Sequence, residues 1–223
     1  LSYGFWIPQE KVHVQGVEGI DPADFRFAQR LGYTIKLLSV IRADADGQVE
    51  VRTQPALVPL SHVLASVSGS FNAVLVNGDI VGETLFYGRG AGQDPTSSSV
   101  ISDLCEAAAV LLYGARHSGF VPHGLYGKSK PVEDTVSHYY LRLTVDDVPG
   151  VMAQVAAVLG RRNIGISSMI QPEDLEDTSG STSIVLMIHD ATLGEMKAAL
   201  EEIGALSCVR EKPSWMRVET LQG

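Results

Sequence analysis

A short segment in the last third of the chain places a carboxylate, a proline and a glycine in front of an expected helix. The segment runs from Asp146 to Met152, and Asn163 and Ile164 follow the helix. Because a helix N-terminus carries free N–H groups and the positive end of the helix dipole, it favours an anion such as an amino-acid carboxylate. Glycine at position 150 lets a ligand approach the backbone closely. A purely structural interpretation, in which Asp147 caps the helix and Pro149 begins it, fits the same residues.

A glycine-rich turn in the first half is the second candidate for chemistry. Gly88-Arg89-Gly90-Ala91-Gly92 precedes Asp94-Pro95-Thr96-Ser97. Glycines permit close approach of a ligand, and Thr96 or Ser97 is expected to cap a helix whose positive end can face a polar cofactor. A tight strand-to-helix turn with hydroxyl caps is the structural alternative. The turn lacks the last glycine and the βαβ context of a dinucleotide-binding fingerprint.

Other reactive side chains form no recognisable centre. Lys36 lies in an apolar strand-like run, where a lysine that extends to the strand edge is favoured over a general acid. No metal-ligand or catalytic-triad spacing connects the histidines, which are His13, His62, His117, His123, His138 and His189. Cys105 and Cys208 are expected to be separate buried thiols, and residues 173–177 a solvated acidic loop.

The elements that must position the second segment alternate regularly. Apolar alternation predicts strands, and apolar residues at helical spacing predict amphipathic helices. Strands are expected at 139–145, 164–170, 183–188 and 217–219, and helices at 149–159 and 193–203. The order βαββαβ is that of a ferredoxin-like split βαβ unit.

The first half predicts a mixed or antiparallel sheet with helices. Asp21 and Pro22 begin a helix that Gly32 ends. Hairpins are expected from strands 34–41 and 49–53 around the turn 44–47, and from strands 72–76 and 81–87 around the turn 77–79. A helix at 100–112 is apolar on most sides and therefore needs cover on more than one face. The fold class is α+β, with domains at 1–116 and 138–223 and a linker at 117–137.

Bulk composition excludes several partners. The 223 residues carry 17 basic and 26 acidic side chains, for a formal charge of -9, and no Lys/Arg run. This argues against nucleic acid and anionic membranes. The sequence has neither an apolar stretch long enough for a membrane helix nor a signal-peptide layout, so a cytoplasmic location is expected.

The second unit resembles ACT domains over residues 139–219. The resemblance rests on the string D-x-P-G-V at 147–151, a helix, and then G-x-x-x-I-x-I from Gly160. It implies a small-molecule site, usually for an amino acid, at the interface between paired copies. The implied effector-binding residues are Asp147, Val148, Pro149, Gly150, Val151, Asn163 and Ile164, with Asp147 accepting from the ammonium group and Asn163 bonding in both directions.

The first unit resembles homoserine dehydrogenases from about Lys11 to Leu112. Five strings occur in the family's order: Val17 to Ile20, Leu31 to Leu38, Pro55 to Pro59, Asn72 to Val74, and Gly88 to Thr96. The resemblance implies that the glycine turn lies beside NAD or NADP, with NADP favoured, and that the following helix packs onto a nucleotide-binding domain. The implied cofactor-binding residues are Gly90, Ala91, Gly92, Thr96 and Ser97.

The resemblance also implies the reaction. The family interconverts aspartate 4-semialdehyde and homoserine, in threonine, methionine and isoleucine biosynthesis. No catalytic residue is expected within this chain, because the family's acid/base signature would lie upstream of Leu1, and the chain alone is expected to be inactive. Threonine is the expected effector, and a homodimer or homotetramer the expected assembly. The alternative is a non-enzymatic amino-acid-sensing ACT module whose first domain is degenerate.

Overall fold

The computed structural model describes residues 3–114, 127–171 and 180–220. The first half contains η1 (Gln9–Lys11), β1 (His13–Val14), α1 (Pro22–Arg30), β2 (Tyr33–Ala43), β3 (Gln48–Pro59), η2 (Val63–Ser66), β4 (Phe71–Gly78), β5 (Gly82–Arg89) and α2 (Gln93–Tyr113). The second half contains β6 (Lys128–Ser129), η3 (Val132–Asp134), β7 (Val136–Asp146), α3 (Val151–Arg161), β8 (Ile166–Ile170), β9 (Ser181–Thr192), α4 (Leu193–Gly204) and β10 (Ser214–Val218).

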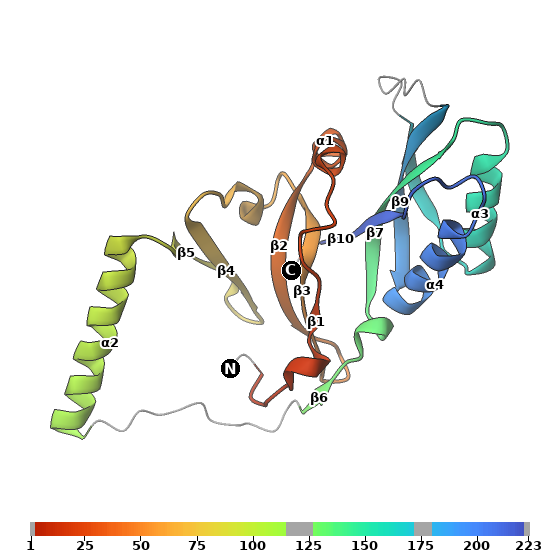
Figure 1. Cartoon of the computed structure of the whole chain (residues 1–223). Helices are drawn as coiled ribbons and strands as arrows, with labels where there is room; N and C mark the ends of the chain where they lie inside the picture. Colours follow the sequence, from red (N-terminus) through yellow and green to blue (C-terminus); the bar gives the residue numbers. More distant parts are fainter. Residues whose placement is uncertain (1–2, 115–126, 172–179, 221–223) are drawn as a thin grey trace.

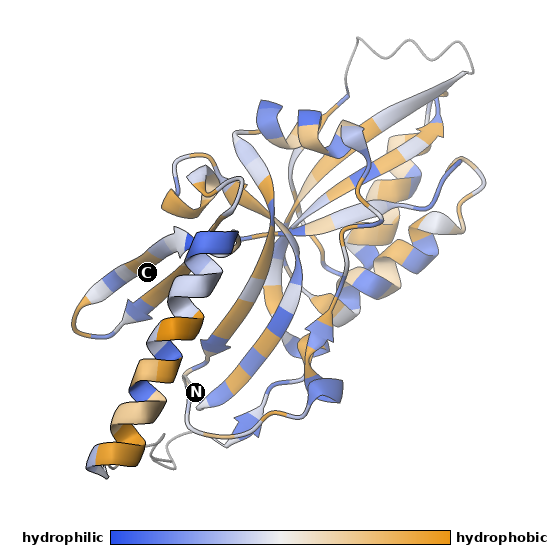
Figure 2. Ribbon diagram, turned by 60° about the vertical axis from the view of Figure 1, so that its left-hand side comes forward, coloured by the Kyte–Doolittle hydropathy of each residue, from blue (hydrophilic) through white to orange (hydrophobic). Residues whose placement is uncertain are grey.

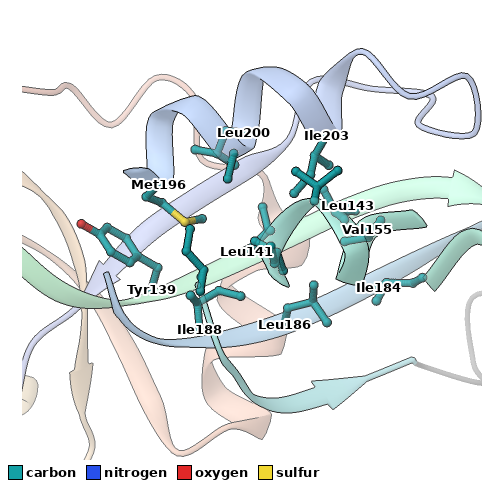
Figure 3. Packing of buried hydrophobic residues seen from close by; sticks show 14 of the residues in the cluster. Tyr139, Leu141, Leu143, Val155, Ile184, Leu186, Ile188, Met196, Leu200 and Ile203 are labelled. Atoms are coloured by element: carbon teal, nitrogen blue, oxygen red, sulfur yellow. The ribbon is translucent and has the colours of Figure 1, made fainter. Parts of the chain in front are cut away.

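The predicted βαββαβ order is confirmed by the elements from β7 to β10. Their strands lie in the order β10-β7-β9-β8, and every neighbouring pair is antiparallel. Helices α3 and α4 cover one face of this sheet (Figure 1). Figure 3 shows the core between them, formed by Tyr139, Leu141, Leu143, Val155, Ile184, Leu186, Ile188, Met196, Leu200 and Ile203.

This sheet continues into the first half of the chain. β10 pairs in parallel with β3, through Arg217 with Ala56 and Val218 with Leu57, while β2 forms a long antiparallel hairpin with β3. Of the predicted linker, residues 117–126 lie outside the described residues. Lys128–Ser129 forms β6, which pairs with the start of β3. The two halves therefore share one sheet rather than meeting only through side chains.

A buried polar layer accompanies the β3–β10 pairing. The Arg52 guanidinium donates to both carboxylate oxygens of Glu219, at 2.6 and 3.1 Å, and both side chains are almost fully buried. The neighbouring Arg217 donates to the Thr135 hydroxyl at 2.6 Å and lies over the ring of Tyr139. The desolvation cost of burying two charges offsets much of their attraction, so the pair adds little net stability, but removing one partner would leave the other charge buried and uncompensated.

Helix α1 covers the other face of the second-half sheet. The expected start is confirmed: Asp21 is the N-cap, Pro22 is the first helical residue, and Asp24 completes a capping box. Phe27 and Ala28 pack in an apolar cluster with strand residues that include Tyr140, Met187, Met216 and Val218. The helix therefore ties the first half to the second independently of the strand pairing.

Asp24 is the polar centre of that contact. Its fully buried carboxylate accepts from the Tyr140 hydroxyl at 2.8 Å, from Arg142 Nε at 2.6 Å and from the Ser214 hydroxyl at 3.0 Å. Burial alone would raise the pKa of Asp24, but the hydrogen bonds from Arg142 and Tyr140 hold it below its usual value of 3.8. The charged form is thus the form that the folded protein stabilises.

The hairpin of β4 and β5 and the long helix α2 extend away from the shared sheet (Figure 1). The expected turn at 77–79 is wrong by two residues, because Asn77 and Gly78 still pair with Glu83 and Gly82, so the turn spans 79–81. Helix α2 begins seven positions earlier than expected, and none of its residues is buried. No described helix is long and apolar enough to cross a membrane.

The exposure of α2 overturns one expectation about the cysteines. Cys208 is buried as expected, but Cys105 is exposed because it lies on α2. Figure 2 shows apolar residues along this helix, and Ile101, Leu104 and Leu111 are all more than half exposed. Such a surface is typical of a helix whose packing partner is another chain segment or another protein.

We predict that Asp24→Asn lowers the free energy of unfolding by about 3 kcal/mol at pH 7, because it breaks a buried pair and leaves Arg142 without its counter-charge. Since the pKa of Asp24 is lowered on folding, the charged carboxylate stabilises the fold above pH 3.8, and this contribution disappears as the pH falls through the lowered pKa. Urea unfolding at pH 7 and pH 3 should therefore show a difference that shrinks in acid. Asp21→Asn, which keeps a good N-cap, is the control.

A second prediction concerns α2. In the isolated chain its amides should exchange with solvent quickly, because burying each large apolar side chain would stabilise the helix by about 1.5–3 kcal/mol and none is buried here. Self-association should accompany this exposure. Slow exchange throughout α2 in a monodisperse monomer, measured by mass spectrometry, would contradict this account of the helix.

Candidate functional site

The glycine-rich turn connects the end of β5 with the start of α2. Gly90 donates its N–H to the Ser70 carbonyl at 2.9 Å, and Gly92 has a φ of +133°, a conformation that favours glycine. Gly92 is the N-cap of α2, and no side chain caps the helix. The glycine-rich turn and the first turn of helix α2 are exposed, apart from the half-buried Pro95.

The expectation that Thr96 or Ser97 caps α2 is therefore wrong. The helix already begins at Gln93, so both hydroxyl residues lie inside it, and the Thr96 N–H donates to the Gly92 carbonyl at 3.1 Å. The reason is Pro95, the third helical residue. A proline fits the first turn because N–H groups there lack intrahelical partners, so the helix can include it.

The turn fits a polar ligand on two counts. A Cβ added at Gly88 would meet no atom within 4 Å, so the backbone is open on that side. The first turn of the 21-residue helix α2 presents its positive end without a side-chain cap. A polar or anionic part of a nicotinamide cofactor could approach there. The backbone of the glycine-rich turn and the first turn of α2 would hold it.

The purely structural interpretation of the segment before α3, with Asp147 as the helix cap and Pro149 as the first helical residue, is wrong. Gly150, with a φ of +93°, is the N-cap, and α3 begins at Val151, so Asp147 does not cap the helix and Pro149 does not begin it. The exposed Asp147 donates its backbone N–H to the Gly180 carbonyl at 3.1 Å. A Cβ at Gly150 would meet nothing within 4 Å, which leaves the backbone open to a ligand.

The other half of the predicted effector site follows α3. Asn163 is exposed and has a φ of +56°, whereas Ile164 is buried in the core and donates its N–H to the Leu159 carbonyl. Helix α3 has 11 residues, so its two ends are about 16 Å apart. One copy of the chain therefore does not bring Asn163 next to the segment 147–151, a separation that already follows from the helix predicted at 149–159.

The remaining candidates support no catalytic centre. Lys36 is half-buried on β2 and donates to the Val67 carbonyl, which fits the structural interpretation. His138 lies 2.9 Å from Asp190, yet no cluster of three metal-binding side chains occurs among the residues described. A cavity of about 460 Å³ at the end of α4 is lined by Trp215 and Arg210 among others, and by none of the predicted site residues.

Comparison with known proteins gives two family matches along the chain. The profile of the homoserine dehydrogenase family matches residues 1–105, and that of the ACT domain matches residues 139–207. Curated homoserine dehydrogenases from Neisseria gonorrhoeae and Pseudomonas aeruginosa are 36% and 37% identical to the chain, over 99% of its length in both cases. The chain covers 51% and 52% of these relatives, and thus spans about half the length of the curated relatives it matches.

A solved structure agrees with these matches. A homoserine dehydrogenase from Thiobacillus denitrificans superposes with a TM-score of 0.82 at 35% identity, covering 96% of this chain and 48% of that one. The similarity extends across both halves of the chain. The chain thus corresponds to the carboxy-terminal region of homoserine dehydrogenases, and its residues 139–207 match the ACT domain.

Proposed function

We propose that the chain is the cytoplasmic, regulatory half of an NAD(P)-dependent homoserine dehydrogenase, which interconverts aspartate 4-semialdehyde and homoserine. It would contribute a dimerisation surface, part of the cofactor pocket and an effector domain, divided at about residues 1–116 and 138–223. The observation that carries this proposal is the similarity to curated homoserine dehydrogenases over nearly the whole chain, together with an open glycine turn at the start of α2.

In this proposal the glycine turn contacts the cofactor, which supplies or accepts a hydride at the substrate's aldehyde carbon when bound. Gly90, Ala91 and Gly92 would offer backbone, and Thr96 and Ser97 would offer hydroxyls from the first turns of α2. Exposed apolar residues on α2 would then pack against a nucleotide-binding domain. Such packing would exclude water from the turn and strengthen its polar contacts.

We predict that the 223-residue chain alone does not oxidise homoserine with either nicotinamide cofactor. The same chain should regain activity when it is joined to the amino-terminal half of the Thiobacillus denitrificans relative, because that half would cover α2 and complete the pocket. Turnover by the chain alone would overturn the division of labour. A joined protein that folds and binds threonine but has no activity would instead favour an amino-acid-sensing module.

We propose that the effector site is completed by a second copy of the chain, and the geometry of one copy supports this proposal. β8 is the last strand of the sheet, and in the described residues it pairs only with β9. Ile166, near Asn163, pairs with Ile188, whereas Ser181 at the opposite end of β9 pairs with Asp146, next to the segment 147–151. The two half-sites therefore lie at opposite ends of the same sheet.

Antiparallel pairing of two β8 edges would bring these half-sites together. It would set the Asn163 end of one copy beside the Gly150 end of the other, and two equivalent sites would form. Helix N–H groups and Asp147 would then hold the carboxylate and ammonium groups of an amino acid, and Asn163 from the partner would close the site. Threonine, the end product of the pathway, is the proposed effector.

We predict that Gly150→Val weakens threonine binding about tenfold, because a β-branched residue is strained at a φ of +93° and crowds the backbone. Asp174→Ala, in the acidic stretch, should leave the affinity unchanged. Calorimetry should be run at a concentration at which the dimer persists. Equal losses in both variants, or no binding to the parent chain, would reduce the domain to a dimerisation element.

Mixing two variants with weakened threonine binding tests the two-copy arrangement. Asn163→Ala should also weaken binding, and dimers formed from this variant and Gly150→Val should recover one of their two sites, since one interface site then contains neither change. Threonine stoichiometry in the mixed sample is the measurement. No recovery in verified mixed dimers would show that both residues act within one copy.

A further inference from the structure

Asn72 occupies the space that a side chain at position 90 would need. A Cβ built on Gly90 would lie 1.7 Å from Asn72 Nδ2 and 2.6 Å from its Cγ. Gly90 does not have a positive φ, unlike Gly92, so its φ angle does not by itself call for glycine. The glycine at position 90 is therefore explained by the Asn72 side chain, which rests on the turn.

Strand pairing fixes Asn72 in this place. Asn72 on β4 pairs with Gly88 on β5, and the Gly90 N–H bond to Ser70 extends the hairpin to the turn. On the adjacent position of β4, the Phe71 ring stacks on Tyr87 at 4.8 Å. Because successive strand residues point to opposite faces, Asn72 is held on the face that it shares with Gly88 and Gly90.

The amide itself is available to a ligand. Asn72 is exposed, and within the described ranges its side chain makes no hydrogen bond. An asparagine offers two donors and one acceptor, and so matches a ligand group that both donates and accepts. Filling space at a glycine turn needs no such group, since an apolar side chain of the same shape would serve.

We propose that Asn72 is a cofactor-binding residue, whose amide hydrogen-bonds the carboxamide or a ribose hydroxyl of the nicotinamide cofactor at the glycine turn. This inference rests on the proposed function and adds a side chain to a contact otherwise made by backbone and helix hydroxyls. The paired carboxamides of ligand and protein would satisfy each other's donor and acceptor. Gly90 would be required so that the amide can lie flat on the turn.

Cofactor binding to the joined protein described above, followed by the fluorescence of the reduced cofactor, tests the assignment. Asn72→Leu keeps the shape of the side chain and removes its hydrogen bonds, so the Kd should rise about 5- to 10-fold. The melting temperature should change little, because the residue is exposed. Asn77→Ala, farther along the same strand, should leave both the Kd and the melting temperature unchanged.

A second pair of variants separates hydrogen bonding from space. Gly90→Ala should weaken binding because its Cβ displaces the amide, and adding Asn72→Gly should relieve the clash without restoring affinity. A double variant that binds like the parent, or an unchanged Kd in Asn72→Leu, would overturn the assignment of Asn72 and leave the proposed function standing. A folded parent protein that does not bind the cofactor would overturn the proposed function, and with it this assignment.

Discussion

The parallel pairing of β10 with β3 is the contact on which the arrangement of this chain depends. It joins residues 56–57 to residues 217–218, and the Glu219 N–H extends it by donating to the Leu57 carbonyl at 2.9 Å. The buried Arg52–Glu219 pair favours this register, because a shifted strand would leave the buried Glu219 carboxylate without its Arg52 partner. The last strand of the βαββαβ unit thus joins the sheet of the first half.

This pairing constrains how the ACT domain can meet another copy. One edge of its sheet is occupied by β3, one face is covered by α3 and α4, and the other face is covered by α1 through Phe27 and the Asp24 cluster. The β8 edge is the one that stays open among the described strands. An effector bound at that edge would be connected to the β2–β3 hairpin through one hydrogen-bonded sheet. If the two paired ACT domains can pack in two ways, a change from one packing to the other could shift the strands of the first half through this sheet.

Much of the fold could be predicted from local pattern, and the long-range contacts could not. The βαββαβ order and the start of α1 follow from periodicity and capping residues, which act over a few positions. The sequence predicts a strand at 49–53, yet β3 continues to Pro59 and includes Pro55. The β3–β10 pairing and the Asn72–Gly90 contact depend on residues brought together only by the tertiary fold. The early start of α2 could have been read from Pro95, which suits a first helical turn.

Native-state hydrogen exchange across the strand pairing tests the central claim most directly. If β3 and β10 unite the two halves, the amides of β3, β10 and β7 should open with a common free energy, equal to that of global unfolding. The Glu219→Gln variant should lower this free energy for all three strands together. Protection that is high in β7 and β9 but much lower in β2 and β3, and insensitive to Glu219→Gln, would show two independent units and would contradict the account.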